Sequence, residues 1–275
     1  MWVLIVGVIL LAVYAVVESR WIRPVSYEVT VADLAPEFDG FSILHLSDLH
    51  GRVGVFSHPR FRQWIASADL VAVTGDLYQP GLSRRPVMQA LDRMRQQCPA
   101  LLVSGNHDYH HHGKLFFDPL IVEDWLLDNR AVAIQRQEAK LWVAGVPDLV
   151  MGRPNWTKML SEIGPGPAIL LSHRPDGAML PPARRFQLVL SGHTHGGQIV
   201  LPGLGALLKH NHVGQGYVAG LRQLPWGSVL ITSRGLGTSE LPMRFLCRPE
   251  LVKIVLKRST QGALAEDITG KGAAP

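Results

Sequence analysis

Five short polar clusters along the chain carry side chains that bind divalent metal ions. Together they supply two aspartates, one asparagine and four histidines: Asp48, His50, Asp76, Asn106, His173, His193 and His195. Carboxylate, amide and imidazole donors in combination suit Mn, Fe or Zn better than Ca. Seven ligands are too many for one tetrahedral ion. They suffice for two ions that share a carboxylate, an arrangement that recurs in phosphoryl chemistry.

Each cluster on its own has a simpler explanation. A single histidine after a strand is usually a turn or surface residue, and Gly-Asp is common in turns. Short motifs also match by chance. The metal prediction therefore depends on the ordered series of clusters. His45, which lies inside an apolar run, is interpreted as a structural residue.

Every cluster directly follows a short run with the composition of a buried strand. These runs are rich in Leu, Val and Ile and are bounded by turn residues: 42–47, 70–74, 101–104, 168–172 and 188–191. Loops beyond the carboxyl ends of strands are where open α/β sheets bind ligands. We therefore expect the clusters to converge on one sheet edge. Glycines at Gly75, Gly105 and Gly192 permit the tight turns that this requires.

Helix-like segments separate these runs, at 59–68, 85–97, 119–129 and 155–163. Strand–helix alternation favours a layered α/β fold with helices outside the sheets. Three later runs, at 141–144, 229–233 and 251–256, lack helices between them and indicate a second sheet packed on the first.

The N-terminus has no charged residue from Trp2 to Val17, and Glu18, Arg20, Trp21 and Arg23 follow. A run of this length is near the short end of what spans a bilayer, about 17 to 25 residues. No Lys or Arg precedes it, which disfavours the alternative of a cleaved signal peptide. We predict a transmembrane anchor over residues 1–23 in the inner (cytoplasmic) membrane. The arginines after the apolar run place the catalytic domain on the cytoplasmic side.

The remaining sequence indicates one domain, residues 24–260, and a flexible Gly- and Ala-rich tail, residues 261–275. The net charge of +5 could favour anionic lipids or phosphorylated substrates, or simply reflect a solvated basic surface. There is no arginine-rich run or nucleic-acid module, so no nucleic-acid partner is expected. Two isolated cysteines form no disulfide framework and fit a reducing compartment.

The motifs Asp-x-His, Gly-Asp, Gly-Asn-His-Asp, a later His and Gly-His-x-His, in this order, resemble the calcineurin-like metallophosphoesterase family over roughly residues 38–258. The stretches GHTHGGQIVLPG, SRGLGTS and RPELVKIVL are similar to the branch that contains the YkuE and YaeI phosphodiesterases and the LpxG type of UDP-2,3-diacylglucosamine diphosphatase. The resemblance implies a four-layer αββα sandwich of two packed mixed β-sheets flanked by helices. It also implies two divalent ions, with Mn expected and Fe or Zn as alternatives.

The resemblance further implies a role for each site residue. One ion would be held by Asp48, His50, Asp76 and His195, and the second by Asp76, Asn106, His173 and His193. Asp76 would bridge the two ions. His107 matches the family's catalytic histidine, which contacts the phosphate and protonates the leaving oxygen.

One departure from the family pattern is informative. Many members carry Gly-Asp-x-x-Asp-Arg, whose second Asp orients the catalytic histidine and whose Arg binds phosphate. Gln79 and Pro80 stand at these positions here. Asp108 could orient His107 instead. Arg52 and Arg174, which flank metal ligands, are candidates for substrate binding, although loop arginines are more often simply solvated.

These features predict a membrane-anchored phosphohydrolase that cleaves a phosphodiester or pyrophosphate bond by metal-activated hydroxide. Apolar segments at 115–127, 201–208 and 241–246 would form a lipid-facing wall, or would be ordinary core packing. The expected substrate is UDP-2,3-diacylglucosamine, in lipid A synthesis. The alternatives are a general phosphodiesterase or cell-wall phosphatase that faces outside, and a metal-binding scaffold that has lost catalysis.

Overall fold

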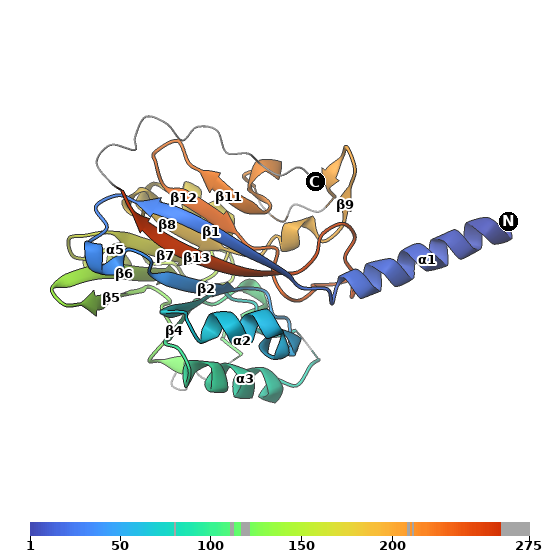
Figure 1. Cartoon of the computed structure of the whole chain (residues 1–275), viewed down its shortest axis with the longest axis horizontal. Coiled ribbons are helices and arrows are strands. Elements are labelled where there is room, and N and C mark those ends of the chain that lie inside the picture. The colour runs from blue at the N-terminus through green and yellow to red at the C-terminus, as the bar shows by residue number, and fades with distance from the viewer. Residues whose placement is uncertain (80, 111–112, 117–121, 208–209, 211, 260–275) are drawn as a thin grey trace.

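Two mixed β-sheets pack face to face and carry helices on their outer sides (Figure 1). The computed structural model describes residues 1–79, 81–110, 113–116, 122–207, 210 and 212–259. The helices are α1 (Trp2–Glu18), α2 (Pro59–Ile65), α3 (Arg85–Arg95) and α5 (Trp156–Ser161). Short 3-10 turns are η1 (Pro36–Phe38), η2 (Gly54–Ser57), η3 (Asn106–Asp108), η4 (Pro175–Met179), η5 (Pro181–Arg185), η6 (His195–Gly197) and η7 (Gln215–Tyr217).

The first sheet has the strand order β1-β13-β2-β3-β4. Its strands are β1 (Arg23–Val31), β13 (Glu250–Arg258), β2 (Ser42–Leu46), β3 (Leu70–Val73) and β4 (Ala100–Leu102). β2, β3 and β4 run parallel, while β13 is parallel to β1 and antiparallel to β2. The run at 251–256, which we expected in the second sheet, therefore belongs to the first.

The second sheet has the order β11-β12-β8-β7-β6-β5. Its strands are β11 (Gly220–Gln223), β12 (Val229–Thr232), β8 (Leu188–Ser191), β7 (Ala168–Ser172), β6 (Ala139–Val146) and β5 (Arg130–Arg136). The four central strands are parallel, and β5 and β11 are antiparallel edges. A separate hairpin is formed by β9 (Val200–Leu201) and β10 (Gly205–Ala206).

Side chains from both sheets share the central core, including Ile43 and Ile254 from the first sheet and Leu171 and Leu190 from the second. Every residue of β2 is buried, as expected for a strand covered on both faces. Helices α2 and α3 cover the outer face of the first sheet, and α5 packs on the outer face of the second. The predicted α/β fold of two packed mixed sheets is confirmed.

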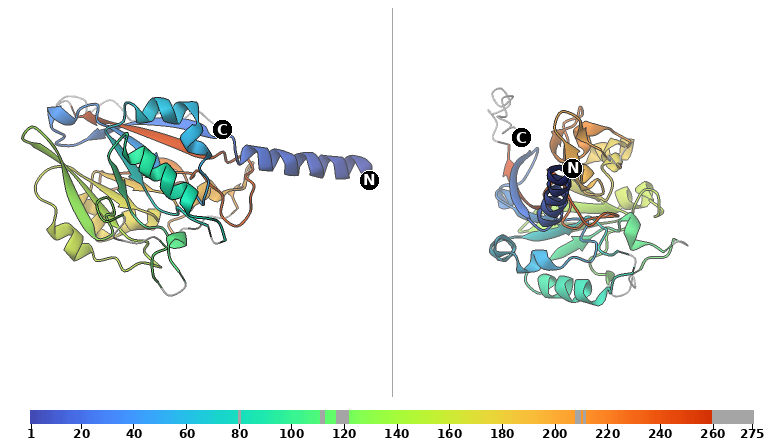
Figure 2. Two further views of the ribbon diagram at one scale, coloured as in Figure 1. Left: turned by 90° about the horizontal axis from the view of Figure 1, so that it is seen from below. Right: turned by 90° about the vertical axis from the view of Figure 1, so that its right-hand side faces the viewer.

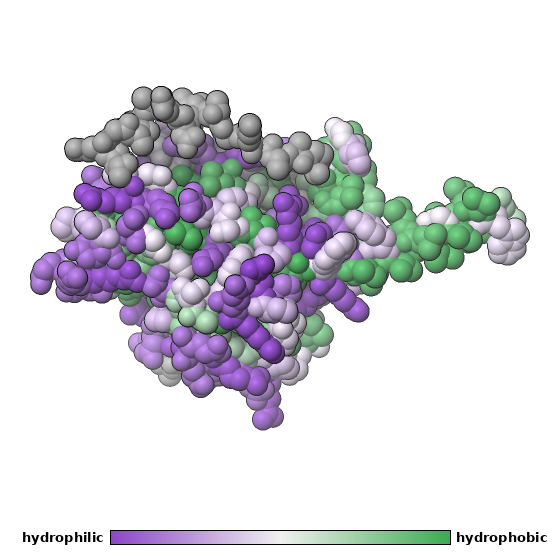
Figure 3. All heavy atoms as spheres, in the orientation of Figure 1, coloured by the Kyte–Doolittle hydropathy of each residue, from purple (hydrophilic) through white to green (hydrophobic). Residues whose placement is uncertain are grey.

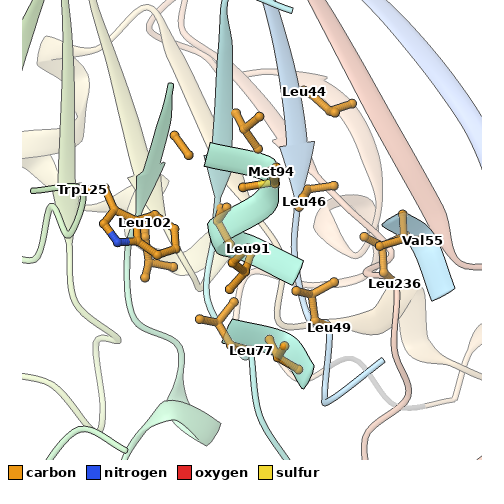
Figure 4. Packing of buried hydrophobic residues seen from close by; sticks show 14 of the residues in the cluster. Leu44, Leu46, Leu49, Val55, Leu77, Leu91, Met94, Leu102, Trp125 and Leu236 are labelled. Atoms are coloured by element: carbon orange, nitrogen blue, oxygen red, sulfur yellow. The ribbon is translucent and has the colours of Figure 1, made fainter. Parts of the chain in front are cut away.

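Helix α3 shows how the spacing of apolar residues determines which helix face packs on the first sheet. Val87, Leu91 and Met94 recur at helical spacing and are buried. Leu91 and Met94 pack beside Leu46 of β2 and Leu102 of β4 (Figure 4). The helices expected at 59–68, 85–97 and 155–163 are confirmed as α2, α3 and α5.

The segment expected as a helix at 119–129 differs. Residues 119–121 lie outside the described residues, and Leu126 forms an isolated parallel bridge to Leu102 beside β4. Val122 is helical, residues 123–125 form a turn, and the chain then runs beside β4, so among the described residues the prediction differs from the structure only after Val122. Residues 261–275, the predicted flexible tail, also lie outside the described part of the chain.

Helix α1 projects from the body of the molecule (Figure 2). From Trp2 to Tyr14 its side chains are exposed and apolar, as with Val3 at 87% and Leu10 at 63%, whereas Ala15 and Glu18 are buried. Figure 3 shows the apolar surface of this helix on one face of the molecule. Within the described chain, no helix is both long enough and apolar enough to cross a membrane. α1 has 17 residues, about 26 Å at helical rise, against a hydrocarbon core of about 30 Å. The predicted transmembrane helix is thus not supported.

Candidate metal centre

The seven predicted ligands all lie in loops that follow the carboxyl ends of strands. β2, β3 and β4 of the first sheet precede Asp48, His50, Asp76 and Asn106, and β7 and β8 of the second sheet precede His173, His193 and His195. The site therefore lies where the ends of two sheets meet. We had expected a single sheet edge. The packing of the two sheets brings the second set of histidines against the first set of ligands.

Asp76 belongs to one of two groups of candidate metal-binding side chains and also faces the other. Donor atoms of Asp48, His50 and His195 lie within 4.8 Å of one another, and so do those of Asp76, His173 and His193. Oδ2 of Asp76 is 3.5 Å from Nε2 of His50 and 3.4 Å from Nε2 of His173. One carboxylate oxygen thus faces both groups, as a bridging ligand would.

The two remaining residues of the predicted site lie beside these groups. Oδ1 of Asn106 is 3.1 Å from Nε2 of His173. The ring of His107 meets the ring of His50 edge-on, with centroids 4.9 Å apart. Its backbone N–H donates to Oδ1 of Asp76 at 2.8 Å. The fold therefore brings together all seven predicted ligands and His107.

The backbone at these ligands is strained. Asp48, His50, Asp76, His193 and His195 all have positive φ, between 44° and 69°. Such conformations are uncommon for residues other than glycine and cluster at functional sites. Gly75 and Gly105 let two of the loops approach, since a Cβ added to Gly75 would lie 2.4 Å from the Gly105 nitrogen. The fold holds the ligand loops in a conformation that sequence preference alone would not favour.

Asp108, which we expected to orient His107, instead holds the loop that carries Asp76. Its carboxylate accepts hydrogen bonds from the backbone N–H groups of Asp76, Leu77 and Gly105 at 2.8–2.9 Å. Burial and the charge of Asp76 raise the pKa of Asp108 to about 7. Asp108 therefore positions the turn that carries Asp76, and the suggestion that it orients His107 is wrong.

A buried chain of hydrogen bonds ends on Asp48. The Ser47 hydroxyl donates to Oδ2 of Asp48 at 2.5 Å, and the Thr74 hydroxyl donates to Ser47 at 2.8 Å. Nε2 of His45 lies 2.8 Å from the Thr74 hydroxyl. His45, which we interpreted as structural, therefore fixes the groups that orient a candidate ligand. Its position three residues before Asp48 did not signal this role.

Both candidate substrate-binding arginines are already engaged. Arg174 forms an ion pair with Asp148 at 2.7 Å, and its Nη1 lies 2.7 Å from Nε2 of His193. Arg52 donates to the carbonyl oxygen of Ser19 at 2.6 Å and to the Thr238 hydroxyl at 3.1 Å. Arg52 also lines a cavity of about 380 Å³ together with His50 and Gln79. Pro80, the other departure from the family pattern, lies outside the described residues.

Electrostatics at the site fit a cationic occupant. Burial raises the pKa of Asp48 to about 6 and lowers that of His50 to about 4. Burial would also lower the pKa of His173, but the charge of Asp76 and a hydrogen bond to it raise it to about 10. Buried carboxylate and imidazole donors that point at one another are stabilised by a shared positive charge. The donor set fits two divalent ions.

We expect metal binding to release about one proton per chain near pH 7. In the metal-free protein His173 carries a proton below about pH 10, and a coordinating nitrogen must lose it. The apparent affinity should therefore fall as the pH falls. Calorimetric titration with Mn²⁺ in buffers of different ionisation enthalpy measures the released protons. An observed enthalpy that is the same in all buffers would contradict the prediction.

The calcineurin-like phosphoesterase family model matches residues 41–197, more than half of the chain. A Bacillus subtilis (strain 168) protein described as "Uncharacterized metallophosphoesterase YkuE" is 32% identical over 260 residues, which cover 87% of this chain and 88% of that protein. The chain belongs to the calcineurin-like phosphoesterase family. A Danio rerio "Transmembrane protein with metallophosphoesterase domain" is 28% identical over 278 residues, which cover 90% of this chain and 61% of that longer protein.

Solved structures show a weaker likeness to this calcineurin-like phosphoesterase. The Thermus thermophilus protein TT1561 is 16% identical with a TM-score of 0.47, covering 72% of this chain and 90% of that one. A dimetal phosphatase from Danio rerio is 13% identical with a TM-score of 0.44, covering 72% and 88%. Likenesses of this size carry no argument about function. The family model and the converging donors together make the protein a metallophosphoesterase, a hydrolase with donors for two metal ions.

Proposed function

We propose that this metallophosphoesterase hydrolyses a phosphodiester or pyrophosphate bond in a membrane amphiphile, with UDP-2,3-diacylglucosamine of lipid A synthesis as the substrate that fits best. The observation that carries the hydrolytic part is the position of Asp76. Its Oδ2 faces His50 on one side and His173 on the other at 3.4–3.5 Å. This is the geometry expected of a carboxylate shared by two ions about 3.5–4 Å apart.

Each site residue has a separate role in the proposed reaction. Asp48, His50, Asp76 and His195 would hold one ion, and Asp76, Asn106, His173 and His193 the other. Two divalent ions, Mn or alternatively Fe or Zn, supply activation of the attacking water and neutralisation of charge on the phosphoryl oxygens. His107 protonates the leaving oxygen. Arg174, held by Asp148, adds a fixed positive charge beside His193.

The surface around α1 supports a lipid environment. A helix that is apolar on every side is normally covered, and α1 is exposed from Trp2 to Tyr14. At its foot the Arg248 guanidinium lies 4.1 Å from the Trp21 ring, an aromatic and basic pair suited to a membrane interface. Leu246, whose backbone N–H is bonded to Glu18 of α1, is exposed at 44%. Leu204, Leu207 and Leu241 are further exposed leucines of the body.

Two cavities have Arg52 in their lining, one beside His50 and one at the foot of α1. The cavity that contains His50 shares Arg52 with a second cavity of about 510 Å³, which is lined by Arg20, Ile22 and Leu236 among others. We propose that a phosphate held at the metal centre lies with its apolar part toward the foot of α1, on the side where these two cavities adjoin Arg52. This arrangement favours an amphiphilic substrate over a small soluble ester.

We further propose that α1 attaches the protein to the inner membrane, with the catalytic domain on the cytoplasmic face, because Arg20 and Arg23 follow the apolar helix. Flotation with phospholipid vesicles tests the attachment. Leu10→Asp should weaken it by roughly 100-fold, whereas Val150→Asp, at an equally exposed apolar position on the body, should not. A reporter fused after Pro275 that is active only outside the cytoplasm would overturn the orientation.

The substrate is tested with purified full-length protein in detergent with Mn²⁺, by comparing release of UMP from UDP-2,3-diacylglucosamine with hydrolysis of bis-p-nitrophenyl phosphate. Strong preference for the lipid is expected. Hydrolysis of the small diester alone would favour the alternative of a general phosphodiesterase or a cell-wall phosphatase. Two bound ions without hydrolysis of either substrate would favour the alternative of a metal-binding scaffold that has lost catalysis. The reason for this alternative is that Gln79 and Pro80 stand where many family members carry the Asp-Arg pair.

A further inference from the structure

The last turn of α1 is bonded to a loop that runs from Arg244 to Cys247. The backbone N–H of Arg244 donates to the carbonyl oxygen of Ala15 at 2.9 Å. The two carboxylate oxygens of Glu18 accept the N–H groups of Leu246 and Cys247 at 2.8 Å each. Glu18 is only 2% exposed. A carboxylate buried in this way is stabilised by the two backbone donors, and it ties the loop to the helix.

The side chain of Arg244 extends this connection into the body of the protein. Its guanidinium is buried and, among the described residues, has no carboxylate within ion-pair distance. Instead it donates to five backbone carbonyl oxygens, at 2.6–3.4 Å, on His195, Arg234, Gly235, Gly237 and Cys247. A buried cation without a counter-charge is costly unless its hydrogen bonds are satisfied, so these carbonyls fix its position closely.

Two of the segments held by Arg244 lead directly to candidate metal ligands. Nη2 of Arg244 lies 3.3 Å from Nδ1 of His195, on the side of the ring opposite the metal-binding nitrogen. The other segment packs on the Asp48 loop, because the N–H of Leu236 donates to the Ser47 carbonyl and that of Gly237 to the Asp48 carbonyl. A single guanidinium therefore joins the loop that supplies His195 to the 234–237 segment, which in turn binds the loop that supplies Asp48.

We infer that Arg244 and Glu18 are positioning residues of the metal centre: they hold Asp48 and His195 at the separation that one ion requires, and they make the foot of α1 a structural part of that ion's site. The inference rests on the proposed ligand set. Neither residue touches substrate or ion. Their effect passes through the 244–247 loop and the carbonyls of residues 195 and 234–237.

The variants Arg244→Lys and Glu18→Gln test this role. Lysine keeps the charge but lacks the fork of donors that reaches several carbonyls at once. Glutamine places an NH₂ donor against one of two backbone N–H groups. Each change should weaken one of the two metal sites by roughly 10- to 100-fold, the usual effect of removing a group that orients a ligand. The other site should keep its affinity.

Each control makes the same type of substitution at a residue that does not contact the ligand loops. Arg248→Lys changes an arginine of the same region that bonds the carbonyls of Trp21 and Ile22 and touches neither ligand loop. Glu28→Gln changes an exposed glutamate on β1. The readouts are bound Mn²⁺ per chain at a fixed free concentration and the electron paramagnetic resonance signal of a spin-coupled Mn pair. Circular dichroism and Tm report folding.

Folded Arg244→Lys and Glu18→Gln proteins that bind about one ion and lose the coupled signal, beside controls that bind two, would support the inference. Two ions of unchanged affinity in either folded variant would overturn it. If Arg244→Lys fails to fold, Glu18→Gln decides. Failure of both to fold would assign the residues to folding and overturn the positioning role. A wild-type protein that itself binds fewer than two ions would instead overturn the ligand set of the proposed function.

Discussion

Asp76→Asn is expected to lower kcat by about 10³-fold or more, the largest effect of any single substitution in this chain. The change removes a negative charge between two groups of donors, where one carboxylate oxygen faces both His50 and His173. An amide offers one neutral acceptor in place of a shared anion, so at least one ion should be lost. Losing a preorganised charge at a phosphoryl-transfer site carries a penalty of this order.

The measurement pairs kcat with bound Mn²⁺ per chain and Tm. Asp69→Asn is a matched control, because Asp69 directly precedes β3 while Asp76 follows it, and Asp69 pairs with Arg136 far from the ligands. The control should keep both ions and its turnover. An Asp76→Asn protein within tenfold of wild-type kcat would show that this carboxylate does not bridge.

His107→Gln should lower kcat by about 10²- to 10³-fold while two ions stay bound. The backbone N–H of His107, which donates to Asp76, is retained in the variant. Only the ring beside His50 is removed. Because the expected role is protonation of the leaving oxygen, the loss should be large for an alkoxide leaving group and small for p-nitrophenolate, which needs no proton.

Kinetics on a paired series of alkyl and nitrophenyl phosphodiesters measure this leaving-group dependence. His110→Gln is the control, since His110 is an exposed histidine of the same loop and its ring lies against Phe116. Equal losses for both leaving groups would assign His107 to phosphate binding. Loss of an ion in the variant would make it a ligand, which its closeness to His50 and Asp76 would permit.

Much of this site could be predicted from sequence because each ligand comes directly after a buried strand. The runs before Asp48, Asp76, Asn106, His173 and His193 are short, apolar and bounded by turn residues, and all five are strands. The residue types then restrict the chemistry to a few metals. Because the two sheets pack face to face, ligands that are distant in sequence lie close together in space.

The supporting residues could not be predicted, because their roles depend on contacts without a local pattern. Arg244 lies in a segment, 241–246, whose composition indicated either a lipid-facing wall or ordinary core packing. Leu241 and Leu246 are indeed exposed, but the arginine between them is buried against carbonyls from two other loops. Glu18 was assigned no role from the sequence, because the two backbone groups that it binds are more than 200 residues away.

The rigid attachment of α1 has a kinetic consequence. Because its last turn is bonded to the loop of Arg244 and to Arg52, the helix cannot swing freely relative to the catalytic body. If α1 lies in lipid, as proposed above, the His50 cavity would stay at a set height above the bilayer surface. Encounter with a lipid substrate would then occur by lateral diffusion in two dimensions. The rate would follow the mole fraction of substrate in the surface, and added inert lipid would slow the enzyme at constant bulk concentration.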